Sequence, residues 1–210
     1  MVSALEALDR LREGNRRFAA NTRSADPKTQ LRPAEVAAGQ EPFAIILGCS
    51  DSRVPAEIIF DQGLGDLFVI RVAGNIVAPS QIGSVEFAAT AFGTRLVVIL
   101  GHSQCGAIHA TLEQLQTPSG NRSRNLRSIV DFIRPSVEPL LDPGLGLDTD
   151  AIVERAVRAN VRSSSEQMRC GSVILEELER DEGLIIIGAE YSLDTGLVDF
   201  FDGILESEKK

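Results

Sequence analysis

Residues 95–106 read RLVVILGHSQCG. The run that follows the arginine is apolar and partly β-branched, which is typical of a strand buried on both faces of a parallel sheet. Three more segments share this character: FAIILGC (43–49), DLFVIRV (66–72) and GLIIIGAEY (183–191). Helix-like segments alternate with them, at 79–93, 104–115 and about 148–180. We therefore predict an α/β fold, a single domain with a mostly parallel central sheet flanked by helices.

The chain has 210 residues, of which 43% are hydrophobic, and this is enough for one domain with an ordinary core. No repeat or long linker divides it, so we expect one domain over 1–210, with an N-terminal helical arm at 1–20 and an α/β core at 40–205. The apolar residues of the first segment recur at three-residue spacing: Val2, Leu5, Leu8 and Leu11. This spacing predicts an amphipathic helix that packs on its own domain or on a partner. In our fold prediction it extends to pack on a partner subunit.

Charge and cysteine content restrict the partners and the compartment. The chain carries 21 Lys and Arg against 30 Asp and Glu, and the net charge of −9 repels nucleic acid and anionic membranes. The N-terminal segment lacks the apolar run of a secretory signal, and no stretch is long and apolar enough for a membrane span. Three cysteines are an odd number, which favours reduced thiols or metal ligands over disulfides. We expect a cytoplasmic protein.

Soft metal ligands follow two of the predicted strands. Cys49 ends the first apolar run, and His102 and Cys105 follow the third. Because parallel strands end at the same edge of a sheet, we expect these three side chains to meet there. Two cysteines and a histidine suit Zn²⁺, and three protein ligands leave the fourth tetrahedral position open, as in catalytic zinc sites. Asp51 and Arg53 alternate with serines just after Cys49 and are expected to face the same side.

Both ligand motifs carry a resemblance to a known family. GCSDSRVP (48–55) together with GHSQCG (101–106) resembles the β-class carbonic anhydrases. Three further segments look like family segments in the same order: RVAGNIV (71–77), IGSVEFAAT (82–90) and GAEYSLDTG (188–196). The resemblance implies one Zn²⁺ per subunit, held by Cys49, His102 and Cys105. It implies reversible hydration of CO₂ to bicarbonate by attack of zinc-bound hydroxide.

The resemblance also assigns residues around the metal. Asp51 and Arg53 match a catalytic dyad in which the arginine holds the aspartate and the aspartate accepts a hydrogen bond from the zinc-bound water or hydroxide. Five other positions match the family's substrate pocket: Gln40, Phe68, Ala73, Phe87 and Gly106. In the family, the apolar wall of this pocket often comes partly from a neighbouring subunit. Phe87 departs from members that have tyrosine there. A homodimer or homotetramer is implied, and the nearly uncharged segment 79–93 is a plausible interface.

Two other functions stay open at this stage. One is a hydrolase of CO₂-like molecules, such as carbonyl sulfide or carbon disulfide, on the same scaffold. The other is a non-catalytic zinc-binding or bicarbonate-sensing module, with Asp51 as a fourth ligand. We interpret His109 as a packed or solvent-facing side chain and Cys170 as a buried thiol. Some family members bind bicarbonate as an effector through a tryptophan, an arginine and a tyrosine, and the matching positions here are Ile46, Arg71 and Tyr191. This chain has no tryptophan, so we expect that effector site to be absent or weak.

Overall fold

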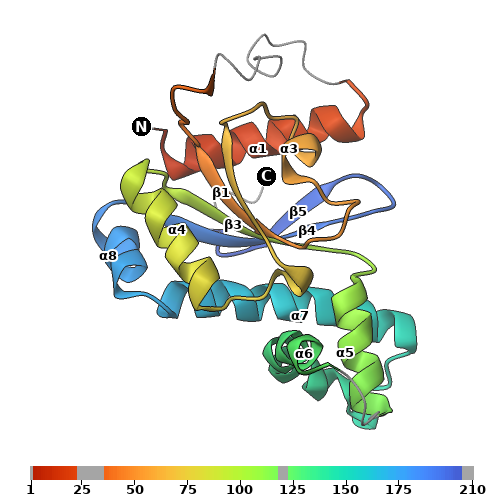
Figure 1. The fold of residues 1–210 in the computed structure, drawn as a ribbon. Coiled ribbons are helices and arrows are strands. Elements are labelled where there is room, and N and C mark those ends of the chain that lie inside the picture. Colours follow the sequence, from red (N-terminus) through yellow and green to blue (C-terminus); the bar gives the residue numbers. More distant parts are fainter. Residues whose placement is uncertain (1, 23–35, 118–122, 205–210) are drawn as a thin grey trace.

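The computed structural model describes residues 2–22, 36–117 and 123–204, and within them five strands form one sheet in the order β2-β1-β3-β4-β5 (Figure 1). Strands β1 to β4 are parallel to one another, and β5 is antiparallel to β4. The predicted mostly parallel α/β fold is therefore confirmed. Residue 1 of the predicted arm and residues 118–122 and 205 of the predicted core lie outside the described residues. No helix of the described segments is long and apolar enough to cross a bilayer.

The four predicted strands form at the expected places, with ends that differ by one or two residues. The strands are β1 (Ala44–Gly48), β2 (Leu67–Arg71), β3 (Leu96–His102), β4 (Ile185–Tyr191) and β5 (Val198–Asp202). The helices are α1 (Ala4–Ala19), α3 (Ala56–Ile59), α4 (Pro79–Ala91), α5 (Gly106–Gln116), α6 (Arg124–Val137), α7 (Thr149–Cys170) and α8 (Val173–Asp181). Short 3₁₀ turns cover Ala73–Asn75, Glu138–Leu141 and Pro143–Leu145.

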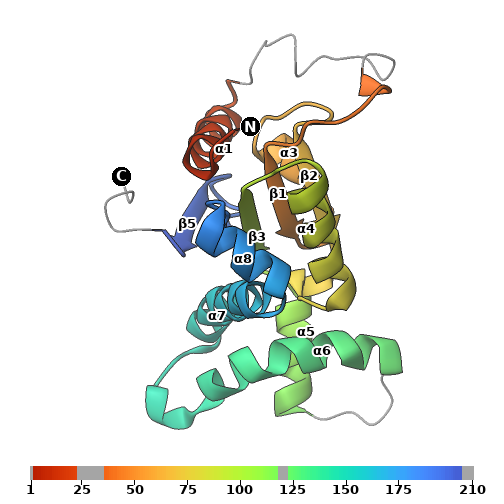
Figure 2. The same ribbon diagram turned by 90° about the vertical axis from the view of Figure 1, so that its left-hand side faces the viewer.

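Helices cover both faces of the sheet (Figure 2), and strand residues alternate between two cores. Ile46, Val98 and Leu100 point to the face covered by α1 and α3, whereas Leu47 and Ile99 point to the face covered by α4, α7 and α8. This alternation follows from the two-residue period of a strand. A third cluster, which includes residues of α5, α6 and α7, lies beyond the carboxyl ends of the strands.

The first helix packs on its own domain. Ser3 caps α1 by accepting a hydrogen bond from the backbone N–H of Glu6. Ala7, Leu8 and Leu11 are buried in the same core as β1 and β3. This side of the helix therefore packs on the chain's own sheet, whereas Leu5 is 43% exposed, and the packing of the helix on a partner subunit stays a prediction.

Other differences from the predicted elements have local causes. The predicted helical stretch of about 148–180 is two helices, because Ser172 adopts an extended conformation after Gly171 and caps α8 through its hydroxyl. Helix α6, which contains Pro135 within its helical range, was not predicted from the sequence. Strand β5 was not predicted either, because this five-residue edge strand has the sequence VDFFD, which does not alternate cleanly between apolar and polar residues.

Candidate metal centre

The sheet register brings the three predicted ligands together. Gly48 at the end of β1 pairs with Leu100 of β3, so Cys49 emerges beside the last residues of β3. His102 is the final residue of β3, and Cys105 is the N-cap of α5 three residues later. All three side chains are buried, and their ligand atoms lie within 4.8 Å of one another. The predicted convergence is confirmed.

The spacing of the two sulfur atoms suits a tetrahedral zinc site. Sulfur atoms that both bind one Zn²⁺ at about 2.3 Å, at the tetrahedral angle, are about 3.8 Å apart. The Sγ atoms of Cys49 and Cys105 are 4.0 Å apart, and both cysteines are free of disulfides. The donor set is therefore already close to the geometry that zinc requires.

The histidine presents the correct nitrogen to this cluster. Nδ1 of His102 lies 2.9 Å from the carbonyl oxygen of Ser103, and because a carbonyl only accepts, Nδ1 must carry the proton. The lone pair then resides on Nε2, which is buried and has no hydrogen-bond partner among the described residues. A buried nitrogen without a partner is costly unless something binds it, and a metal ion fits this requirement.

The two cysteine sulfurs lie within hydrogen-bonding distance of each other. This contact lowers the pKa of Cys49, and the backbone N–H of Gly74 acts in the same direction. The same contact with Cys49 raises the pKa of Cys105, although the N–H groups of Ala107 and Ile108 at the start of α5 oppose this. Both sulfurs must be deprotonated to bind a dication, and the backbone N–H groups directed at them favour the deprotonated forms.

Asp51 and Arg53 form the predicted pair beside the cluster. Nε and Nη2 of Arg53 donate to the two carboxylate oxygens of Asp51 at 3.0 and 2.8 Å, and the backbone N–H of Arg53 donates to Oδ1 at 2.9 Å. These hydrogen bonds hold the pKa of Asp51 well below its usual range, so the carboxylate stays ionised. Its Oδ2 lies 3.9 Å from Nε2 of His102, and this carboxylate therefore borders the cluster.

Comparison with known proteins decides the family. The family model described as carbonic anhydrase matches residues 44–198, which is more than half of the chain. A solved structure described as the β-carbonic anhydrase CafA of Aspergillus fumigatus superposes with a TM-score of 0.74 at 27% identity, covering 93% of this chain and 90% of that one. This chain belongs to the β-carbonic anhydrase family. A relative named carbonic anhydrase 2, from Mycobacterium tuberculosis, is 39% identical over 189 residues, 89% of this chain and 87% of the relative. One from Mycolicibacterium smegmatis, named carbonic anhydrase, is 37% identical over 192 residues, 90% and 89% of the two chains.

The roles of two residues that support the centre of this β-carbonic anhydrase family member were not predicted from the sequence, which assigned Arg71 only to the effector site and gave Ser103 no role. Arg71 donates from Nε to the carbonyl of Cys49 at 3.0 Å and from Nη2 to the carbonyl of Asp51 at 2.6 Å, which fixes the loop between ligand and dyad. The hydroxyl of Ser103 accepts a hydrogen bond from the backbone N–H of Leu193, so the segment after β4 anchors the loop that follows His102, residues 103–105. The order of the family segments in the sequence was the available signal for these two residues. That order does not specify which backbone groups Arg71 and Ser103 bind.

The predicted pocket residues divide into two groups. Ala73 belongs to the 3₁₀ turn next to the Cys49 sulfur, and Gly106 is the first residue of α5, so both lie near the ligands. Phe68 pairs in register with Ile45, four residues before Cys49, and is about 13 Å from the ligand level at about 3.3 Å per strand residue. The ring of Phe87 packs against Phe68 with centroids 6.2 Å apart.

Gln40 lies farther still from the ligands of its own chain. It is exposed and precedes β1, whereas Cys49 follows the opposite end of that strand. Phe87 is 55% exposed. One chain therefore brings together the ligands, the dyad, Ala73 and Gly106, and leaves Gln40, Phe68 and Phe87 outside this group.

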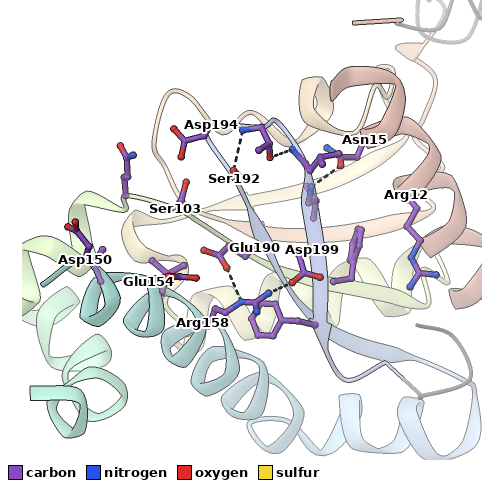
Figure 3. Close-up of a pocket in the computed structure, with 18 of the residues that line it drawn as sticks. Arg12, Asn15, Ser103, Asp150, Glu154, Arg158, Glu190, Ser192, Asp194 and Asp199 are labelled. Atoms are coloured by element: carbon purple, nitrogen blue, oxygen red, sulfur yellow. Dashed lines mark hydrogen bonds and ion pairs between the residues drawn. The ribbon is translucent and has the colours of Figure 1, made fainter. Parts of the chain in front are cut away.

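A separate pocket of about 1490 Å³ lies beside the loop that follows His102, between α1, α7 and the β4–β5 hairpin (Figure 3). Ser103, Gln104 and His109 line it, but none of the three predicted ligands does. Its charges are partly paired, since Arg158 contacts both Glu190 and Asp199. This pocket is therefore distinct from the metal centre.

The two remaining candidates, His109 and Cys170, lie outside the ligand cluster. His109 is exposed on α5, which agrees with a solvent-facing interpretation. Cys170 is exposed at the end of α7, so the prediction of a buried thiol is wrong. Helix α7 ends there, and the sequence does not show on which face its last residue lies.

Proposed function

We propose that this protein is a zinc enzyme that catalyses the reversible hydration of CO₂ to bicarbonate and a proton. One observation carries the proposal: Cys49, His102 and Cys105 converge with a free histidine Nε2, and an ionised Asp51 borders them. Membership of the β-carbonic anhydrase family and the names of the relatives support it.

The three ligand side chains would hold the metal, and Asp51 would orient the reactants. A zinc ion in this site would lower the pKa of a water molecule and supply hydroxide near neutral pH. An ionised carboxylate only accepts hydrogen bonds, so Asp51 would accept a hydrogen bond from the O–H of the attacking oxygen. A lone pair of that oxygen would then be directed at CO₂. Arg53 keeps that carboxylate ionised and fixed through two side-chain hydrogen bonds. Water and CO₂ together supply the atoms of bicarbonate and the released proton.

We infer that a second copy of the chain completes the substrate pocket. The apolar wall expected from Phe68 and Phe87, and the amide of Gln40, are distant from the ligands of their own chain. Phe87 and Gln40 are exposed, so a second copy of the chain can contact them. A homodimer or homotetramer would satisfy both facts. The cytoplasmic location expected from the sequence stays a prediction.

Stopped-flow measurement of CO₂ hydration by the zinc-loaded protein tests the function. We expect acceleration over the uncatalysed rate, and loss of both zinc and activity in Cys49→Ser. Cys170→Ser is the matched control, because this third cysteine is exposed and outside the cluster, and it should keep both properties. Absence of acceleration would reject the proposal.

The two alternative functions give different outcomes in the same series. Sulfide release from carbonyl sulfide without CO₂ hydration would indicate the hydrolase. A fourth zinc ligand from Asp51 at all pH values, measured by X-ray absorption, together with no turnover, would indicate a sensing module.

A further inference from the structure

Asn160 lies outside every motif considered so far, yet it is connected to a metal ligand through two hydrogen bonds. Its Nδ2 donates to the carbonyl oxygen of Gly74 at 2.9 Å. The N–H of Gly74 donates to Sγ of Cys49 at 3.4 Å. Asn160 belongs to α7 and is 2% exposed, so this contact is not a surface accident.

We propose that Asn160 is a positioning residue for the metal centre, which holds the Gly74 backbone so that its N–H points at the Cys49 sulfur. The proposal rests on the function proposed above, because it concerns the same three ligands. Asn160 touches neither the ligands nor the substrate in this role, and it acts through the Gly74 peptide units.

The conformation of Gly74 explains why an external tether is needed. Its φ is +70°, and a Cβ there would lie 2.7 Å from Cδ1 of Ile133 and 3.1 Å from Cβ of Ala107, so any other residue would be strained here. A glycine has the least restricted backbone of all residues and does not hold this geometry by itself. Hydrogen bonds on both sides of its Cα, to Cys49 and from Asn160, restrain both of its soft torsions.

The location of Asn160 argues that this hydrogen bond has a purpose. It lies between Val157 and Val161, which are buried in the apolar cores beneath the sheet and beside the ligands. A buried amide is costly unless it is hydrogen-bonded, and asparagine is a poor helix former, so packing alone would favour an apolar residue here. The hydrogen bond to Gly74 offsets that cost, and through Gly74 it connects α7 to the metal ligand Cys49.

The chemical consequence falls on the Cys49 sulfur. An N–H directed at a thiolate stabilises its negative charge and lowers the energy of its lone pairs. Outer partners of metal ligands typically affect metal affinity by about 10–100-fold. Loss of the Asn160 tether should therefore weaken metal binding and change the electronic spectrum of a sulfur-bound metal.

Cobalt(II) is the probe, because sulfur-to-cobalt charge-transfer absorption reports on the thiolates directly. We compare wild-type protein, Asn160→Ala and Asn160→Ser, each loaded with Co²⁺, and determine the Co²⁺ dissociation constant by chelator competition. In both variants we expect the charge-transfer band to move to longer wavelength and the dissociation constant to rise about 10–100-fold. Serine is smaller than asparagine and tends to bond to its own helix, so it removes the tether without a clash if the alanine variant does not fold.

Met168→Ala is the control for a merely structural role. Met168 is fully buried on the same helix but packs in the core under the sheet, away from the ligands. It should lower the urea midpoint while the band and the dissociation constant remain those of the wild type. If the Asn160 variants lose stability but keep the wild-type band and affinity, Asn160 is only a packing residue and the inference is wrong. If the wild type itself shows no sulfur charge-transfer band, the proposed metal function fails instead.

Discussion

Gly101, the residue before the ligand His102, lies where α7 crosses the sheet, and we predict that Gly101→Ala destabilises the protein. A Cβ at Gly101 would be 2.5 Å from Cγ2 of Val161 and 3.5 Å from Cγ1 of Val157. Overpacking of this kind typically costs about 1–3 kcal/mol. The φ of Gly101 is not in the left-handed region, so alanine should also reduce the entropy of the unfolded chain, by about 0.4–1 kcal/mol. The expected net loss is about 1–2 kcal/mol.

Gly48→Ala is the matched control, since Gly48 precedes the ligand Cys49 on the neighbouring strand. A Cβ there meets nothing closer than 3.9 Å, which is ordinary contact. Without a clash, only the unfolded-state effect remains, and stability should be unchanged or higher by up to about 1 kcal/mol. The assay is urea unfolding in excess zinc at one fixed protein concentration.

A double-mutant cycle identifies the clash. Val161→Ala removes the obstructing methyl groups and by itself should cost about 2 kcal/mol from lost burial. In the double variant the clash is absent, so its loss of stability should be smaller than the sum of the two single-variant losses by roughly 1–2 kcal/mol. Equal stabilities of Gly101→Ala and Gly48→Ala, or strict additivity with Val161→Ala, would refute the idea that Gly101 is required for close packing of α7.

Three further predictions concern the proposed activity and assembly. Asp51→Asn should lower the rate of CO₂ hydration roughly 100-fold in stopped flow, because an amide can donate the wrong hydrogen bond. The zinc content of this variant should be unchanged, and loss of zinc would contradict the role assigned to Asp51. Hydration should rise from about pH 7 towards 9, because two thiolates neutralise the zinc charge and make its water less acidic than with three histidines. Asp51, whose pKa is lowered by Arg53, stays ionised throughout that range, so a flat profile would oppose this assignment. Phe87→Asp should give a monomer in light scattering, whereas Leu126→Asp, an equally exposed apolar position on α6, should leave the oligomer intact.

The strands and the ligands could be predicted because each has a short-range signal. The apolar run before Gly101 is buried along its whole length in β3, as the sequence pattern requires. Parallel strands end at one edge of the sheet, so Cys49 and His102 had to meet once both strands were identified. By contrast, β5 is a short edge strand with a mixed pattern, and α6 contains a proline. Their formation depends on neighbours that periodicity does not describe.

The sequence by itself determined the order of the strands along the chain and the donor atoms at their ends, because these follow from residue type and local spacing. Its resemblance to a known family implied the pairing of Asp51 with Arg53. Only the tertiary structure decided that α1 packs on its own sheet, that Arg71 holds the ligand loop and that Asn160 reaches Gly74 from 86 residues away. These contacts join segments distant in sequence. Whether two such groups meet depends on how helices and strands pack in three dimensions, which no local pattern of residues specifies.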